Sequence, residues 1–402
     1  MVPPDFMTLL PVDAAQQRLF GLAPAIPVEQ VPIDDCTGRW LAQPLIARRD
    51  QPWASLSAMD GYAIRLAEAP GPWVLAGISS AGDAMPPPLA PGEALRIFTG
   101  APLPPGADAI LIQEEAGVAP DGRIAMTGEG PGRAGKHIRP RASDFAEGQL
   151  LAQAGRTITP ALIGLTALAG HGDLPVHRRI RIALLSSGDE LIPPGAPVPA
   201  GKLPSSNAPM LRAMLHGLPV DLLELGNIPD DLDAVKGAMQ QAADMGADIL
   251  LSTGGASVGD HDLIRPAFTG IGGDLDFWRI RMRPGKPLMA GRLGDMLMLG
   301  LPGNPVSAFA TATLFLLPLV RHMSGSPAPL PTEVQARLAA SLPATEVRAE
   351  YIRAAHENGQ VTPVADQDSA AMLALSHANA LIRREGSAPA LSPGETVPVI
   401  LL

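Results

Sequence analysis

Leu251-Ser-Thr-Gly-Gly-Ala-Ser-Val-Gly-Asp-His-Asp262 is the first of three blocks that indicate the fold, and Arg283-Pro-Gly-Lys-Pro287 and Gly300-Leu-Pro-Gly-Asn-Pro-Val-Ser307 follow it. Each block follows a short apolar run typical of a strand, and each contains glycine, which lets backbone N–H groups approach a ligand closely. Two blocks lead into predicted helices, whose N-termini favour anions. Ordinary turns between strands and helices would explain any one block. Three such blocks close together, acidic in the first and basic in the second, suit a phosphorylated ligand handled with a divalent metal.

Outward from these blocks, strand-like and helix-like runs alternate between residues 180 and 323. The predicted strands are 180–185, 220–225, 248–251, 275–282 and 296–299, and the predicted helices are 208–216, 231–245, 262–268 and 305–323. Strands joined through helices indicate a three-layer α/β/α domain with a mostly parallel sheet. Ligands in such sheets bind beyond the carboxyl ends of the strands, where the three blocks fall.

The rest of the chain predicts a multidomain α/β protein. Short alternating runs separated by Pro/Gly clusters indicate small β domains. Helical periodicity at 8–20 and 156–172 indicates a helical segment whose two parts pack together, which makes the first β domain an insertion. The predicted division is 1–45 with 146–178 as an elongated helical domain, 46–145 as the inserted β domain, 179–327 as the α/β domain, and 328–402 as a C-terminal β domain.

Composition narrows the functional classes. The net charge of −10 and the 3% aromatic content argue against a nucleic-acid binder, so we expect no nucleic-acid partner. The one cysteine, Cys36, fits a reducing compartment. The N-terminus lacks the features of a signal peptide. The longest apolar stretch, 306–320, contains Pro318 and predicts a buried helix rather than a membrane span. We therefore expect a cytoplasmic protein.

Carboxylates follow three consecutive predicted strands of the α/β domain. They are Asp189 and Glu190, Asp230 and Asp231, and Asp260 and Asp262. Oxygen ligands of this kind suit Mg²⁺ shared with a phosphate. The alternative is helix capping, for which Asp230 in particular is well placed.

A basic row precedes the second glycine block. Arg279, Arg281 and Arg283 share one face of a predicted strand, because side chains on a strand alternate. The row runs into a turn that carries Lys286. A solvated charge row is the default explanation, but the position at the ligand edge makes anion binding at least as well supported, since a guanidinium group presents a planar fork to oxyanions.

The third block predicts a helix start. Asn304 is a good N-cap, and Pro305 is favoured at the first helical position. Ser307 then lies in the first turn, near free backbone N–H groups where a tetrahedral oxyanion can bind.

Taken together, the motifs resemble those of the molybdopterin molybdenumtransferases, the family of the MoeA proteins and the gephyrin E-domain. The matching stretches are Ser57-Ala-Met-Asp-Gly-Tyr-Ala63, Arg96-Ile-Phe-Thr-Gly-Ala-Pro-Leu-Pro104, Gly106-Ala-Asp108, Ser187-Gly-Asp-Glu-Leu191, and the three blocks above. A weaker match joins Arg353, Gln367-Asp-Ser369 and Ala378-Asn379. The resemblance covers nearly the whole chain in the right order.

The resemblance implies a homodimer with its active cleft between the α/β domain of one subunit and parts of the other. It implies that adenylylated molybdopterin and molybdate are the substrates, that AMP is released as molybdenum is inserted, and that Mg²⁺ is required. A molybdopterin adenylyltransferase and other proteins of the cofactor pathway become possible partners, and no membrane is involved.

The resemblance also assigns roles to residues of this sequence. Metal binding or organisation of the cleft falls to Glu190, Asp230 and Asp262. The residues that would bind molybdate or a nearby phosphate are Arg283, Lys286, Ser307, Arg353 and Ser369. Arg279 would contact the phosphate side of the pterin. Asp60 and Thr99 of the inserted domain would contribute to catalysis. The residues of the glycine-rich loops that would contact the ligand are Gly254, Gly255, Ser257 and Asn304.

Departures from the family pattern leave alternatives open. Many relatives have lysine where this chain has Arg279 and Arg283, and Ala142-Ser-Asp144 replaces a more common Gly-Glu-Asp. The metal-site role is unsettled between Asp230 and Asp231. A tungsten-inserting or inactive paralogue remains possible, whereas a scaffold role or an adenylyltransferase activity fits this domain composition less well.

Overall fold

A computed structural model of the chain describes residues 9–254 and 263–402. Its central feature is a six-stranded sheet with strand order β16-β13-β17-β21-β20-β18. Neighbouring strands among the first four are parallel, whereas β20 runs antiparallel to both β21 and β18. The strands are β13 (Ile180–Ser187), β16 (Val220–Ile228), β17 (Ile249–Thr253), β18 (Asp274–Arg279), β20 (Pro287–Leu293) and β21 (Met296–Leu301). The predicted α/β class with a mostly parallel sheet is confirmed.

Helices cover both faces of this sheet. Strand β13 shows why, because Ile182 and Leu184 belong to one buried cluster while Ala183 and Leu185 belong to the other. Each leucine or isoleucine buried in this way stabilises the fold by about 1.5–3 kcal/mol relative to exposure. One face carries α4 (Leu232–Asp244) and α5 (Ile264–Gly270). The other carries α1 (Val12–Leu22), α3 (Asn207–Leu215), α6 (Pro305–Thr311) and α7 (Leu317–Met323).

The helical segment Pro305–Met323 is continuous through a π-helical turn at Ala312–Leu316. Its length and composition would allow it to cross a membrane, but 78% of its most apolar window is buried inside the protein. It therefore serves as a core helix of the α/β domain, as the sequence predicted.

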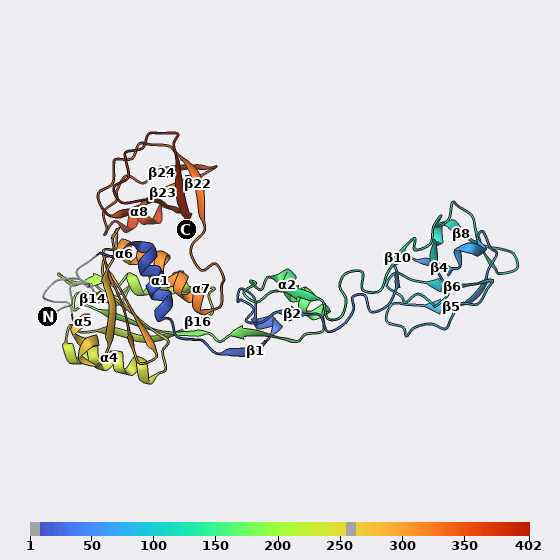
Figure 1. Cartoon of the computed structure of the whole chain (residues 1–402), viewed down its shortest axis with the longest axis horizontal. Helices are drawn as coiled ribbons and strands as arrows, with labels where there is room; N and C mark the ends of the chain where they lie inside the picture. Colours follow the sequence, from blue (N-terminus) through green and yellow to red (C-terminus); the bar gives the residue numbers. More distant parts are fainter. Residues whose placement is uncertain (1–8, 255–262) are drawn as a thin grey trace.

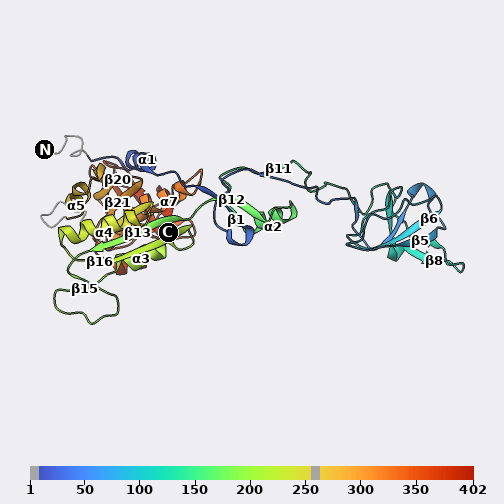
Figure 2. The same cartoon turned by 90° about the horizontal axis from the view of Figure 1, so that it is seen from below.

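The inserted β domain lies far from the α/β domain along the long axis of the molecule (Figure 1). Between them runs a narrow segment in which β1 (Val28–Pro32) pairs with β12 (Asp173–His177) and β2 (Leu45–Ile46) pairs with β11 (Leu150–Ala152). The view turned by 90° shows the same separation (Figure 2). The segment holds one α-helix, α2 (Pro160–Leu168), so strand pairing rather than helix packing gives it its length.

Helix α1 differs from the prediction for the N-terminal region. Residues 8–20 were expected to pack with 156–172, but Ala15 and Leu19 of α1 are buried in the core of the α/β domain. The side-chain amide of Gln16 also donates to the Leu314 carbonyl at 2.7 Å. The apolar face of α1 covers the sheet and α7, and only the chain after residue 27 enters the elongated segment. The positions of the domain boundaries stay predictions.

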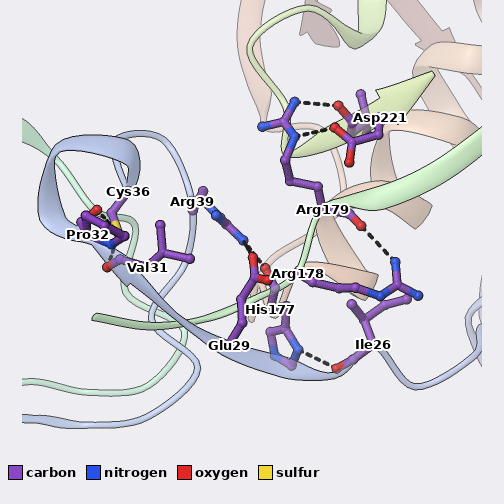
Figure 3. Close-up of polar contacts among 11 residues, drawn as sticks. Ile26, Glu29, Val31, Pro32, Cys36, Arg39, His177, Arg178, Arg179 and Asp221 are labelled. Carbon is purple, nitrogen blue, oxygen red and sulfur yellow. Dashed lines mark hydrogen bonds and ion pairs between the residues drawn. The ribbon is translucent and has the colours of Figure 1, made fainter. Parts of the chain in front are cut away.

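Ion pairs fix the junction between the elongated segment and the α/β domain (Figure 3). Arg39 donates to Glu29 at 3.0 Å and to the carbonyl of His177. Arg179, the residue before β13, donates to Asp221 of β16 at 2.6 Å. The Arg39 contacts therefore hold the β1–β12 ribbon together on one side of the junction, and the Arg179 contact holds the start of β13 to β16 on the other side.

The two small β domains have separate cores. In the inserted domain, the sheet order is β5-β6-β4-β7, with β4 (Gly61–Ile64) between β6 (Glu93–Ile97) and β7 (Ala109–Ile112), and β5 (Val74–Ser79) at the edge. In the C-terminal domain, the strand order is β23-β24-β22-β26-β25, and β23 also pairs with β25, which closes the five strands into a barrel. Those strands are β22 (Glu333–Leu338), β23 (Ala349–Glu357), β24 (Gln360–Pro363), β25 (Ala380–Arg384) and β26 (Thr396–Leu401).

The predicted strand at 275–282 is divided in the structure. Strand β18 ends at Arg279, and β19 (Met282–Arg283) leaves the central sheet to pair with β23 of the barrel. The predicted alternation still holds, because Ile280 and Met282 are fully buried while Arg281 and Arg283 are exposed. The division places Arg283 between the α/β domain and the barrel.

Candidate active site at the carboxyl edge of the central sheet

The predicted site residues of the α/β domain lie along one edge of the central sheet. Four parallel strands end at this edge, β20 begins there, and β18 ends there. In strand order the edge residues are Asp230, Glu190, Gly254, Asn304, Lys286 and Arg279. Neighbouring strands are about 4.8 Å apart, so the row extends over roughly 24 Å. One end of the row is acidic, the other is basic, and Gly254 and Asn304 lie between them.

The acidic end is built from two strand-to-loop connections that bond to each other. The backbone N–H of Asp230 donates to the Asp189 carboxylate at 3.1 Å, and the backbone N–H of Asp189 donates to the Asp230 carboxylate at 3.3 Å. Each carboxylate thereby keeps a second oxygen available. Glu190 folds back over Gly188, so that a Cβ on that glycine would lie 2.7 Å from a carboxylate oxygen of Glu190. Three carboxylates thus lie at the ends of β13 and β16.

The choice between Asp230 and Asp231 has a structural basis. Asp231 is the N-cap of α4, and its carboxylate accepts the backbone N–H of Ala234 at 2.8 Å. Capping, which the sequence allowed for Asp230, is therefore performed by its neighbour. Asp230 is left at the edge with its carboxylate beside Asp189.

Gly254 allows β17 and β13 to end close together. Its φ is +90°, and a Cβ there would lie 2.7 Å from the carbonyl oxygen of Ser187. A Cβ on Gly303, in the loop after β21, would lie 3.5 Å from the Cα of Gly254. Only glycine fits at 254, because both the backbone conformation and the space exclude a side chain.

The loop after β21 is held by the C-terminal barrel. Asn304 occupies the N-cap position of α6 but makes no capping bond with its side chain. Its amide donates instead to the Ser369 hydroxyl at 3.0 Å, and the backbone N–H of Val306 donates to the Ser369 carbonyl at 3.2 Å. Ser307, in the first turn of α6, is 5% exposed. The predicted helix start, with Asn304 at the N-cap and Pro305 at the first position, is confirmed, but the Asn304 side chain makes no capping bond.

Arg353 supports the loop that carries Ser369. The Arg353 side chain is 1% exposed, and its guanidinium group donates to the carbonyls of Asp366 and Asp368, both at 2.9 Å. The Gln367 amide completes the arrangement, because its oxygen accepts the backbone N–H of Arg353 at 3.1 Å. Burial lowers the pKa of Arg353, and the nearby carboxylates oppose this shift. In this structure Arg353 therefore positions the Ser369 loop, and its predicted contact with molybdate stays a prediction.

The basic end of the edge is less constrained. Arg283 lies 3.7 Å from Glu350 of the barrel and is largely exposed. Lys286 is exposed and has no ion-pair partner among the residues that the structure describes. The guanidinium carbon of Arg279 lies 4.5 Å from the centroid of the Trp278 ring. These cations are available to an anionic ligand at neutral pH.

Asp60 and Thr99 form a pair at a distance from this edge. They lie in the inserted domain, at the other end of the molecule from the central sheet (Figure 1). The Asp60 carboxylate accepts the backbone N–H of Thr99 at 2.7 Å and its hydroxyl at 2.9 Å. These two bonds lower the pKa of Asp60, which keeps the carboxylate ionised. Within one chain, Asp60 and Thr99 are not brought together with Glu190.

Three predicted site residues, Gly255, Ser257 and Asp262, lie outside the described part of the chain. Within residues 9–254 and 263–402, no group of three histidine, cysteine, aspartate or glutamate side chains is arranged to hold a metal ion. The acidic end therefore provides carboxylates without a closed set of metal ligands.

Two further residues reach this edge without having been predicted. Lys202, in the Pro-rich loop after β13, donates to the Asp189 carbonyl at 2.6 Å. Asn207 begins α3, is 9% exposed, and donates to the Gly303 carbonyl at 2.8 Å. The Pro-rich composition of residues 193–201 predicted a stiff surface loop. Nothing in the sequence indicated that Lys202, which follows this loop, contacts the site.

The fold and the edge are those of an α/β protein with added β domains. Family models match in three consecutive parts. Residues 10–170 match "MoeA N-terminal region (domain I and II)", residues 183–322 match "Probable molybdopterin binding domain", and residues 335–402 match "MoeA C-terminal region (domain IV)".

Curated relatives agree over almost the whole chain. The molybdopterin molybdenumtransferase of Bacillus subtilis is 31% identical and covers 98% of this chain and 94% of its own length. That of Haemophilus influenzae is also 31% identical, over 97% of this chain and 98% of its own. A crystal structure of the molybdopterin biosynthesis MoeA protein from Pyrococcus horikosii superposes with a TM-score of 0.86 at 25% identity, covering 98% of this chain and 99% of that one. The chain belongs to the MoeA family of molybdopterin molybdenumtransferases, and the resemblance seen in the sequence is confirmed.

Proposed function

We propose that the protein inserts molybdenum from molybdate into adenylylated molybdopterin, releases AMP, and requires Mg²⁺. The observation that carries this proposal is the carboxyl edge, where acidic residues at one end and basic residues at the other flank glycine-rich loops in a chain of the MoeA family. A substrate made of a pterin, phosphates and a nucleotide is long enough to extend along such an edge.

The acidic end suits Mg²⁺. This ion is usually held by one or two carboxylates together with substrate phosphates and water, so it does not need a complete set of protein ligands. Asp189 and Asp230 each use one carboxylate oxygen for a backbone N–H, and Glu190 folds back over Gly188. Glu190 and Asp230, together with Asp262, would hold the ion. When bound, Mg²⁺ would neutralise charge on the phosphoanhydride that is cleaved.

The basic residues bind and orient the anionic groups. Arg279, Arg283 and Lys286 present their charges at the edge and would stabilise negative charge that builds up during cleavage. Molybdate, a dianion, needs several donors around it. Lys286, Ser307 and Ser369 meet this need, because the barrel holds the Ser369 loop against the start of α6. The proposed chemistry requires no nucleophilic side chain of the protein.

We further propose that the working unit is a homodimer in which each cleft uses both chains. Asp60 and Thr99 form a hydrogen-bonded pair in the inserted domain, and that domain lies far from the carboxyl edge of its own chain. An inserted domain on a long arm can reach the edge of a second copy. The ionised Asp60 carboxylate would then face the substrate from the side opposite the central sheet.

Mixed dimers test the reaction and the shared cleft together. Asp60→Asn and Glu190→Gln should each abolish molybdenum insertion as homodimers. Co-expressed chains, purified through two different tags, should recover about half of the wild-type activity, because one of the two clefts then contains neither change. Recovery should be absent if both changes are placed on the same chain and mixed with an inactive partner that carries Asp60→Asn. A mixed dimer without activity would contradict the shared cleft, and a wild-type protein without activity would contradict the proposed function.

A further inference from the structure

A second arginine lies at the basic end of the edge. Trp278 of β18 is 9% exposed, and the guanidinium carbons of both Arg265 and Arg279 lie 4.5 Å from its ring centroid. Arg279 is the last residue of β18, at the carboxyl edge. Arg265 lies in the first turn of α5, the helix that follows β17. One aromatic ring thus holds two cations that come from different elements.

The packing of α5 explains why Arg265 reaches this ring. Ile264 and Phe268 of α5 are fully buried in the same cluster as Trp278. Burial of these residues fixes the rotation of the helix, and Arg265 then lies over the Trp278 ring. The stacked arrangement is therefore set by the core of the domain rather than by a flexible surface side chain.

Stacking leaves the hydrogen-bonding edges of both guanidinium groups unused. A guanidinium group stacks through its face and donates through its edge. Within residues 9–254 and 263–402, neither Arg265 nor Arg279 donates a side-chain hydrogen bond or forms an ion pair. Two unpaired cations beside one ring repel each other, and an anion that accepts from both guanidinium groups would reduce that repulsion.

We propose that Arg265 is a further substrate-binding residue and that Arg265 and Arg279 together bind a phosphate group of the substrate. This inference rests on the proposed function for the identity of the substrate. Two planar forks fit the several oxygens of a phosphate or diphosphate. In the strand order, β20 lies between β18, which carries Arg279, and β21, which precedes Asn304, so the site is distinct from the proposed molybdate position beside Ser307 and Ser369.

Calorimetric titration of the full-length protein with inorganic pyrophosphate tests the pair without any turnover. Arg265→Gln and Arg279→Gln should each weaken pyrophosphate binding by about tenfold or more. Arg265→Lys, which keeps the charge but loses the planar fork, should give an intermediate affinity. Arg181→Gln is the matched control, because it removes an exposed arginine at the opposite edge of the same sheet and should leave affinity within about twofold of wild type. Unchanged thermal unfolding would show that the variants are folded.

Parallel titrations with AMP and with inorganic phosphate identify the group that is bound. Loss of affinity for all three ligands in Arg265→Gln indicates recognition of a single phosphate, whereas loss for pyrophosphate alone indicates recognition of a diphosphate. Wild-type affinity in Arg265→Gln, an equal loss in Arg181→Gln, or no binding of any of these ligands to the wild type would overturn the inference. Binding that depends on Arg265 in a protein that inserts no molybdenum would refute the proposed function and leave the inference standing.

Discussion

Replacement of Gly254 by alanine tests whether the close approach of β17 and β13 is necessary for the site. A Cβ at this position would lie 2.7 Å from the Ser187 carbonyl oxygen, with φ at +90°. The left-handed conformation costs about 1–2 kcal/mol for a residue with a side chain. The contact with a backbone oxygen adds about 1–3 kcal/mol, because no rotamer change can relieve it. We therefore expect Gly254→Ala to destabilise the ends of these strands by about 2–5 kcal/mol.

The chain offers a matched control at Gly272. It has the same φ of +90°, but a Cβ there would meet nothing within 4 Å. Gly272→Ala should therefore cost only the conformational part, about 1–2 kcal/mol, and should leave turnover unchanged. Amide hydrogen exchange of β13 and β17 would measure the local opening free energy, and AMP release would measure turnover. Equal protection and equal turnover in the two variants would refute the steric argument for Gly254.

Three further outcomes follow from the site. Glu190→Gln and Asp262→Asn should each give a folded protein that has lost molybdenum insertion, and wild-type activity in either variant would remove that residue from the metal site. Thr99→Val should raise the pKa of Asp60 towards its ordinary value of 3.8, because one of the two hydrogen bonds to the carboxylate is lost. The stabilisation from this pair is fully present above the pKa that Asp60 has in the unfolded chain, and it is lost as pH falls through the lower pKa of the folded state. NMR titration of the carboxyl group would measure the pKa of Asp60 in the folded protein. Arg353→Met should lower the free energy of unfolding by about 3 kcal/mol and weaken molybdate binding, because two backbone carbonyls lose a charged donor. Calorimetry would measure the affinity for molybdate, and an unchanged affinity would contradict this reasoning.

Sequence periodicity predicted the parts of the fold that local patterns control. The parallel strands were found because each is a short apolar run followed by glycine or a carboxylate, as in β13 before Gly188. Strand β20 was missed although Gly294-Asp295 is a two-residue turn between β20 and β21, a strong hairpin signal. The end of β18 at Arg279 could not be predicted, because the following residues pair with a barrel whose position only the tertiary structure defines.

Site residues could be predicted where a charged side chain lies directly beside the end of a recognisable strand. They could not be predicted where the site depends on contacts between segments that are distant in the sequence. Glu190, Asp230 and Lys286 follow or precede strands that could be recognised, so their shared edge followed from the parallel topology. Arg265 was missed because its importance depends on Trp278, with which it shares no sequence pattern. The support that Arg353 gives to the Ser369 loop also required the structure, since an arginine in a β domain does not by itself show that it is buried.

A single-turnover reaction would show whether AMP release and molybdenum insertion are coupled in this protein. Purified protein, adenylylated molybdopterin, molybdate and Mg²⁺ would be mixed, and both AMP release and molybdenum bound to the pterin would be measured. We expect AMP and inserted molybdenum to appear in equal amounts, and we expect chelation of Mg²⁺ to stop both. AMP release without molybdenum insertion, or insertion that continues without Mg²⁺, would contradict this expectation.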